Sequence, residues 1–171
     1  MIDIAIVGGS GYTGGELIRL LTNHPEVNIS TITSRKFAKQ KLHRVHPNLR
    51  GLDLRFTDNL NKIDSDLIFL AVPHGASMDI IKDYYGSTKI IDLSADFRIS
   101  HELYEEYYGD HSEPDLIEES VYGLPELHRD EIKDADLIAN PGCNATSAIL
   151  GLYPFRNDLE EAIVDLKVSS S

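Results

Sequence analysis

The sequence lacks most of the features that mark secreted, metal-binding, nucleic-acid-binding or membrane proteins. It has a single cysteine and no tryptophan, so neither a disulfide framework nor a zinc site built from several cysteines is expected. No uncharged apolar run approaches the ~20 residues that cross a membrane. The 16 Lys and Arg face 28 Asp and Glu, which gives a net charge of −12 and argues against a phosphate-backbone partner. The first residues have no leader pattern, so we expect a cytoplasmic protein that binds neither nucleic acid nor a membrane.

The patterns that are present favour an α/β fold. Hydrophobic residues make up 42% of the 171 positions, enough for a real core. Short apolar runs typical of buried parallel strands fall at 2–7, 27–33, 67–72, 89–93 and 135–139. Helical periods follow several of them, at 16–21, 76–84 and 143–153, while 35–52 and 100–134 look like loops and short helices. Strands that alternate with helices predict a Rossmann-like, doubly wound parallel sheet.

The end of the sequence suggests a second domain. Residues 162–169 alternate as a strand does, and no further element follows to pair with it or cover it. We therefore expect a chain that stops inside a second, α+β catalytic domain. The predicted organisation is a cofactor-binding domain over 1–142 and the truncated start of the second domain over 143–171.

A glycine-rich turn follows the first predicted strand and opens a helix. The spacing from Gly9 to Gly14 fits G-x-G-x-x-G, and Gly8 adds an overlapping register. In such a turn the small residues let the backbone approach a pyrophosphate, and the helix N-terminus binds its charge. An empty tight turn is the alternative. The predicted contacts of the cofactor at this turn are Gly8, Ser10, Gly11, Tyr12, Thr13 and Gly14.

The end of the second predicted strand indicates which dinucleotide binds. NAD-binding proteins place an acid there to hold the ribose hydroxyls, whereas this sequence has Ser34, Arg35 and Lys36. A hydroxyl and two cations suit a 2′-phosphate, so NADP(H) is favoured, with a solvated basic turn as the alternative. These residues begin a basic island, residues 35–55, which holds seven Lys and Arg against the single acid Asp53. The acids are concentrated elsewhere, with 13 of the 28 at 102–136.

The lone cysteine, Cys143, comes directly after a predicted strand and opens a helix. That places it at the carboxyl edge of the sheet, where ligands bind in open α/β folds. A helix N-terminus stabilises negative charge and suits a reactive thiolate. The alternative is a small buried hydrophobe, the usual state of a free cysteine, and position alone leaves both open.

Several blocks together resemble a known family. They are residues 8–16, 33–35, 46–51, 73–75, 92–98, 122–126 and 140–146, and the most specific are Ser-Ala-Asp-Phe-Arg at 94–98 and Pro-Gly-Cys-Asn-Ala-Thr at 141–146. In this order they are similar to the N-terminal half of the archaeal N-acetyl-γ-glutamyl-phosphate reductases, in the aspartate-semialdehyde dehydrogenase superfamily. Bacterial members more often have Tyr-Pro-Thr after the cysteine. Asn-Ala-Thr is also typical of the LysW-γ-aminoadipyl phosphate reductases of lysine synthesis.

The resemblance implies an NADP-dependent, aldehyde-forming oxidoreductase of arginine biosynthesis. Cys143 would be the nucleophile that turns an acyl phosphate into a thioester, which NADPH reduces. Pro73, His74 and Gly75, called below the 73–75 turn, would line the path of the nicotinamide, although His74 could instead be structural. The family takes a general acid/base histidine and a substrate-binding arginine from its second domain. Residues 1–171 alone are therefore expected to be inactive, and the full-length enzyme to be a homo-oligomer.

Other interpretations remain open at this stage. One is the lysine-pathway reductase, whose substrate is attached to an acidic carrier protein that the basic island could bind. Another is a non-catalytic, NADPH-binding regulator. No metal site is predicted, because His43 and His46 are too few ligands. Arg50 and Arg98 are possible anion contacts. We expect residues 94–98 to be mainly structural, with Asp96 pairing with Arg98 or capping the next turn.

Overall fold

The computed structural model describes residues 1–60 and 63–168, and its centre is a parallel sheet of six strands in the order β2-β1-β3-β4-β6-β5. The strands are β1 (Ile2–Val7), β2 (Val27–Ile32), β3 (Leu67–Leu70), β4 (Lys89–Asp92), β5 (Val121–Tyr122) and β6 (Leu137–Ala139). The helices are α1 (Tyr12–Leu21), α2 (Ser77–Tyr84), α3 (His101–Tyr107), α4 (Asp115–Glu119), α5 (Pro125–Asp134) and α6 (Cys143–Leu152). Short 3₁₀ turns lie at Leu42–Arg44, Pro47–Leu49 and Tyr153–Phe155. The predicted Rossmann-like sheet is confirmed.

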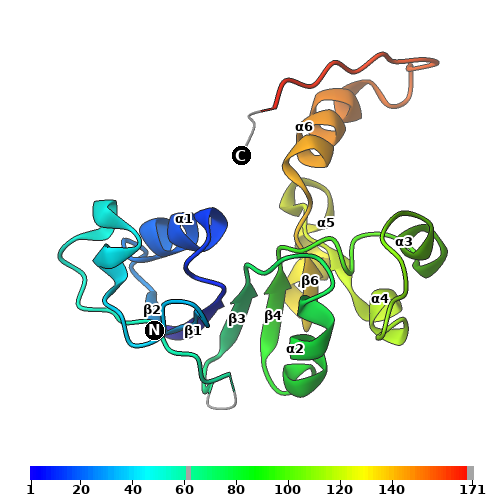
Figure 1. The fold of residues 1–171 in the computed structure, drawn as a ribbon. Coiled ribbons are helices and arrows are strands. Elements are labelled where there is room, and N and C mark those ends of the chain that lie inside the picture. Colours follow the sequence, from blue (N-terminus) through cyan, green and yellow to red (C-terminus); the bar gives the residue numbers. More distant parts are fainter. Residues whose placement is uncertain (61–62, 169–171) are drawn as a thin grey trace.

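Alternation along β1 explains why both faces of the sheet are covered. Ile4 and Ile6 pack with Ile18 of α1 on one face, whereas Ala5 and Val7 belong to the core on the face of α2. All four of the strand residues named are at most 3% exposed. A strand buried on both sides needs helices on both sides, and Figure 1 shows α1 and α2 in these layers.

The chain reverses direction across the sheet beside β1. After β1 it crosses to β2 on one side, and then returns to form β3 on the other side. In open α/β sheets, this switch point at the carboxyl ends of the strands is where ligands bind. The turns after β1 and β3, which begin at Gly8 and Ala71, are therefore the place to look for a site.

Four parts of the sequence interpretation need correction or refinement. The expected strand at 162–169 is wrong over 162–168, which forms no strand, and residue 169 lies outside the described part. That segment has the alternation of a strand, but no described strand pairs with it, and a strand needs a partner for its backbone groups. The sequence interpretation missed β5, a two-residue strand beside an acidic stretch. β3 ends at Leu70, two residues early, and α1 begins at Tyr12, four residues early.

Helix α6 differs in its packing from α1 and α2, each of which has three buried residues. None of its residues is buried, and the segment 153–168 beyond it is almost entirely exposed. Figure 1 shows α6 rising above α5, away from the sheet. Among the described residues, no helix combines the length and apolar character that a membrane crossing requires.

Candidate functional site

The glycine turn packs so tightly that side chains have no room. Gly8 has a φ of +82°, which disfavours other residues, and a Cβ there would overlap the carbonyl oxygen of Ala71. A Cβ on Gly14 would lie 2.6 Å from both the Gly8 carbonyl oxygen and the Gly9 Cα. The start of α1 therefore lies directly against the turn after β1. This close approach is what a pyrophosphate-binding turn requires.

The N-terminus of α1 is open to a ligand. Gly11 is its N-cap, and no side chain hydrogen-bonds to its first N–H groups. These groups and the helix dipole are suited to a negatively charged group. His46, from the basic island, closes the other side: its Nε2 lies 2.8 Å from the Gly9 carbonyl oxygen, and its ring occupies the space beside Gly15. Sequence reasoning missed this contact, because 37 residues separate the partners.

A cavity of about 610 Å³ opens beside this turn. Its lining contains seven of the predicted cofactor residues, namely Gly8, Ser10, Gly11, Ser34, Arg35, Lys36 and Pro73. It also contains residues that the sequence did not single out, namely Val7, Thr33, Asp58, Leu60, Ala71, Val72, Ala76, Asp79 and Ile80. Tyr12, Thr13, Gly14, His74 and Gly75 are not in the lining. The glycine turn, the open helix end and two nearby cations fit a dinucleotide with an extra phosphate.

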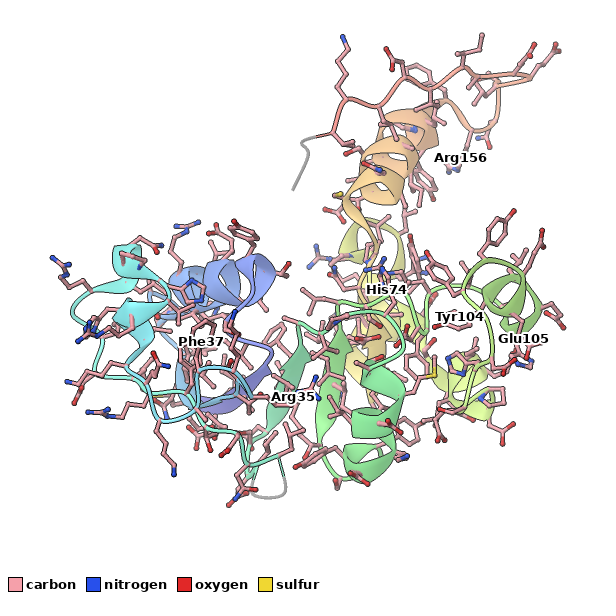
Figure 2. All side chains as sticks on the ribbon, in the orientation of Figure 1. Arg35, Phe37, His74, Tyr104, Glu105 and Arg156 are labelled. Carbon is pink, nitrogen blue, oxygen red and sulfur yellow. The ribbon has the colours of Figure 1, made fainter. Side chains whose placement is uncertain are left out.

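The predicted 2′-phosphate residues divide into one buried hydroxyl and two exposed cations. Ser34 is 5% exposed, donates a hydrogen bond to the Ser10 hydroxyl (2.8 Å) and accepts one from the Phe37 N–H (3.3 Å). It therefore ties the end of β2 to the glycine turn. Arg35 and Lys36 are exposed, and Lys36 Nζ lies 5.3 Å from the centre of the Phe37 ring. Figure 2 shows Arg35 well apart from His74, which lies toward α6.

A buried carboxylate holds the 73–75 turn. Asp96 is 0% exposed. The Gly75 N–H donates to both of its oxygens at 2.9 Å, and the hydroxyls of Ser77 and Tyr104 donate at 2.6 and 3.0 Å. Asp96 thus makes no ion pair with Arg98, and that part of the sequence interpretation is wrong. Within residues 94–98 the Asp96 N–H donates to Ser94 Oγ at 3.0 Å and the Arg98 N–H to the Ala95 carbonyl at 3.3 Å, as expected for a segment whose polar groups satisfy one another. The side chains of Asp96 and Arg98 contact other elements as well.

His74 has a structural contact of its own. Its Nδ1 accepts a hydrogen bond from the Ala95 N–H at 2.9 Å, so its proton is on Nε2. The ring meets Tyr108 edge-on at 5.5 Å between centroids. The side chain is exposed and is not part of the cavity lining. These contacts support the structural alternative for His74.

A second buried carboxylate lies beside Asp96. Asp92, at the end of β4, is 0% exposed and accepts hydrogen bonds from the N–H (3.0 Å) and hydroxyl (2.6 Å) of Ser94. Burial raises its pKa, and the neighbouring Asp96 charge acts in the same direction. Burial and the contact with Asp96 also raise the pKa of Tyr104 to about 12, so this phenol stays a donor.

Arg98, in the segment after β4, reaches toward the start of α6. Its Nε donates to the Asn140 carbonyl (2.7 Å) and its Nη2 to the Leu93 carbonyl (2.7 Å). A Cβ on Gly142 would lie 3.2 Å from Nη1, so the guanidinium lies against the residue before Cys143. A permanent cation is therefore next to the first turn of α6.

Cys143 is the first residue of α6. Gly142 is the N-cap, and no side chain caps this helix. The thiol is exposed, so the alternative of a small buried hydrophobe is wrong. Its Sγ lies 3.8 Å from Asn144 Oδ1, a weak contact that leaves the sulfur accessible. An accessible thiol at an uncapped helix N-terminus has the environment of a nucleophile.

The opposite edge of the sheet has a larger cavity that does not belong to this chemistry. It has a volume of about 720 Å³ and is lined by residues at the amino ends of β1, β3 and β4, with Asp3, Asp64, Asp66 and Asp136 among them. The glycine turn and Cys143 follow the carboxyl ends of their strands, so they lie at the other edge. No group of three or more potential metal ligands occurs among the described residues.

Comparisons with known proteins agree with this geometry. Residues 3–135 match the family described as semialdehyde dehydrogenase, NAD binding domain, which confirms the predicted nicotinamide dinucleotide. The solved structure of aspartate semialdehyde dehydrogenase with NADP from Candida albicans has a similar fold, with a TM-score of 0.66 at 14% identity. That match covers 92% of this chain and 47% of the Candida chain.

Two kinds of reductase are among the more similar relatives. A putative [LysW]-L-2-aminoadipate/[LysW]-L-glutamate phosphate reductase of Thermococcus kodakarensis is 71% identical over 171 residues, which are 100% of this chain and 52% of that protein. An N-acetyl-gamma-glutamyl-phosphate reductase of Methanosphaera stadtmanae is 55% identical over 168 residues, 96% of this chain and 48% of that protein. The chain thus spans about half the length of the curated relatives it matches.

Proposed function

The chain belongs to the semialdehyde dehydrogenase family through its NAD-binding domain, and from this premise we propose that it is the cofactor-binding and nucleophile-bearing part of an NADPH-dependent acyl-phosphate reductase. In this proposal residues 1–142 bind NADPH, and residues 143–171 begin the catalytic domain. The observation that carries it is the accessible Cys143 at an uncapped helix N-terminus, on the same sheet edge as the glycine turn.

The proposed chemistry assigns each group a separate task. Cys143, as a thiolate, attacks the acyl carbonyl carbon, forms a C–S bond and expels inorganic phosphate. Arg98, beside Gly142, contacts the phosphate as it leaves. NADPH supplies the hydride that converts the thioester to a semialdehyde and returns the sulfur as a thiolate. Arg35 and Lys36 bind the 2′-phosphate, and the glycine turn binds the pyrophosphate.

For the acyl group, we propose aminoadipate or glutamate attached to a carrier protein. The sequence interpretation put the N-acetylated substrate first. Four relatives named for LysW-linked substrates have 67–72% identity, which is above the 51–55% of two relatives named for the N-acetylated one, while two further relatives named for LysW-linked substrates have 50% and 47%. The basic island adds support, because an acidic carrier needs a basic surface. Among its described cations, only Lys41 has an acid within ion-pair distance, at 3.1 Å from Asp53.

The test compares two substrates on a polypeptide that extends residues 1–171 to the length of these relatives. With NADPH in excess, we expect kcat/KM for the carrier-linked glutamyl or aminoadipyl phosphate to exceed that for N-acetylglutamyl phosphate by about 100-fold or more. Exclusive use of the acetylated compound would overturn the carrier assignment and favour the second candidate, for which the 55% identical relative is the supporting observation. Residues 1–171 alone are expected to bind NADPH without turnover.

A further inference from the structure

Five side chains and one turn form a buried polar connection between β4 and the cofactor cavity. The members are Asp92 at the end of β4, Ser94 and Asp96 in the segment after it, Ser77 from the start of α2, and Tyr104 from α3. All five are at most 2% exposed. None of them is in the cavity lining, so no direct contact with a ligand explains why a buried core would contain two carboxylates. Burying a charged group is costly unless it is hydrogen-bonded, so the presence of two buried carboxylates indicates a structural or functional role.

The hydrogen bonds show what the connection holds. Asp96 receives four of them, and two come from the single N–H of Gly75. One residue earlier in each segment, the Ala95 N–H donates to His74 Nδ1. The segment after β4 thus holds two successive residues of the 73–75 turn. Gly75 has a φ of +79°, and nothing lies within 4 Å of where its Cβ would be, so neighbouring packing does not hold this residue in place.

The turn that is held this way borders the cavity. Residues 74 and 75 are the ones held by the segment after β4. The residues just before them in the sequence, Ala71, Val72 and Pro73, line the cavity, and so do Ala76, Asp79 and Ile80 just after them. Ser77, which donates to Asp96 Oδ2 at 2.6 Å, fixes the first residue of α2 at the same time. Arg35 and Lys36 line the same cavity from the end of β2. The described hydrogen bonds of the buried polar residues hold the turn after β3 and the start of α2, and they involve neither of these two cations.

We propose that Asp96 is a positioning residue, which holds the 73–75 turn in the shape that receives the nicotinamide half of the cofactor. The proposal rests on the NADPH binding proposed above. Its physical basis is preorganisation: a turn fixed before binding does not lose conformational freedom when the ligand binds. The adenosine half binds at residues that Asp96 does not contact, so its affinity does not depend on this carboxylate.

The test measures two ligands on the same purified chain, NADPH and adenosine 2′,5′-bisphosphate, which lacks the nicotinamide half. In Asp96→Asn, an amide donor replaces one acceptor and faces the Gly75 N–H. We expect the Kd of NADPH to rise about tenfold, as for the loss of one charged hydrogen bond, while the Kd of the bisphosphate stays within about twofold. Asp83→Asn, an exposed aspartate of α2, is the matched control and leaves both unchanged.

Ser77→Ala keeps the test decisive if Asp96→Asn does not fold. This change removes one of the three groups that donate to the Asp96 carboxylate, and we expect the Kd of NADPH to rise about threefold while the Kd of the bisphosphate is unchanged. An equal loss of affinity for both ligands, or an unchanged affinity for both, overturns the positioning role of Asp96 while the proposed function stands. A wild-type chain that binds neither ligand overturns the proposed function itself.

Discussion

Helices α1 and α6 begin in the same way but are packed differently. Each has ten residues, follows a parallel strand, and has a glycine N-cap without a side-chain hydrogen bond. α1 buries Gly14, Gly15 and Ile18 against the sheet and His46, whereas α6 buries nothing. The Arg98 guanidinium lies against Gly142, the N-cap of α6. The same local pattern therefore produces a tightly packed glycine turn at α1, whose residues pack against the sheet and His46. At α6, where no residue is buried, it produces an accessible thiol.

The largest expected effect is on kcat, from a change at the start of α6 that should leave cofactor binding at α1 unaffected. Cys143→Ser in a polypeptide of the relatives' length is expected to lower kcat by about 1,000-fold or more, because the hydroxyl is a far weaker nucleophile than a thiolate. The Kd of NADPH, measured by fluorescence titration, should stay within about twofold, since α1 and not α6 holds the cofactor. Undiminished turnover by Cys143→Ser would contradict the proposal that Cys143 is the nucleophile. A wild-type protein that binds NADPH and never turns over would favour a regulator.

The next effect tests the packing difference with one change made in each helix. A Cβ at Gly14 would meet backbone atoms at 2.6 Å, while nothing lies within 4 Å of one at Gly151. Gly14→Ala should lower the free energy of unfolding by about 1–3 kcal/mol and weaken NADPH binding. Gly151→Ala should raise it by about 0.5–1 kcal/mol, because alanine favours a helix. Urea denaturation of both variants measures the free energy of unfolding. Equal changes in the two variants would contradict the difference in packing between α1 and α6.

A smaller effect concerns the cations beside α1. Arg35→Ala is expected to raise the Kd of NADPH about tenfold, by loss of a charged contact to the 2′-phosphate, and to leave that of NADH within about twofold. The loss should shrink as salt concentration rises, because Arg35 is exposed. Arg156→Ala, at an exposed arginine directly after the 3₁₀ turn that follows α6, is the matched control. Parallel losses for NADPH and NADH would show that Arg35 does not contact the 2′-phosphate.

The smallest effect concerns the buried carboxylate between the two helices. Burial raises the pKa of Asp92, so the folded chain keeps this proton to a higher pH than the unfolded chain, where it titrates near 3.8. Its contribution to stability is complete below that pH and is lost as the pH rises through the raised pKa. Relative to Asp92→Asn, the wild type should therefore lose stability as pH rises across this range. Gly151→Ala, which adds no titratable group, should follow the wild-type pH profile.

Local pattern was enough to predict the elements whose residues repeat with a clear period or spacing. The strands at residues 2–7 and 89–92, the glycine turn and the start of α6 follow from apolar alternation and glycine spacing. The same alternation misled at 162–168, because pairing depends on a neighbouring strand and not on the segment itself. β5 was missed for the converse reason: its two residues carry too little pattern, and β6 holds them in place.

The sequence by itself determined five of the six described strands, the position of the glycines at α1 and the position of the thiol at the start of α6. These follow from backbone sterics and hydrophobic period, which act over a few residues. Only the tertiary structure decided that Asp96 holds Gly75 and not Arg98, that His46 closes the glycine turn, and that Cys143 is exposed. Buried polar groups bind whichever donors the fold brings to them, and these partners lie 21 to 37 residues apart.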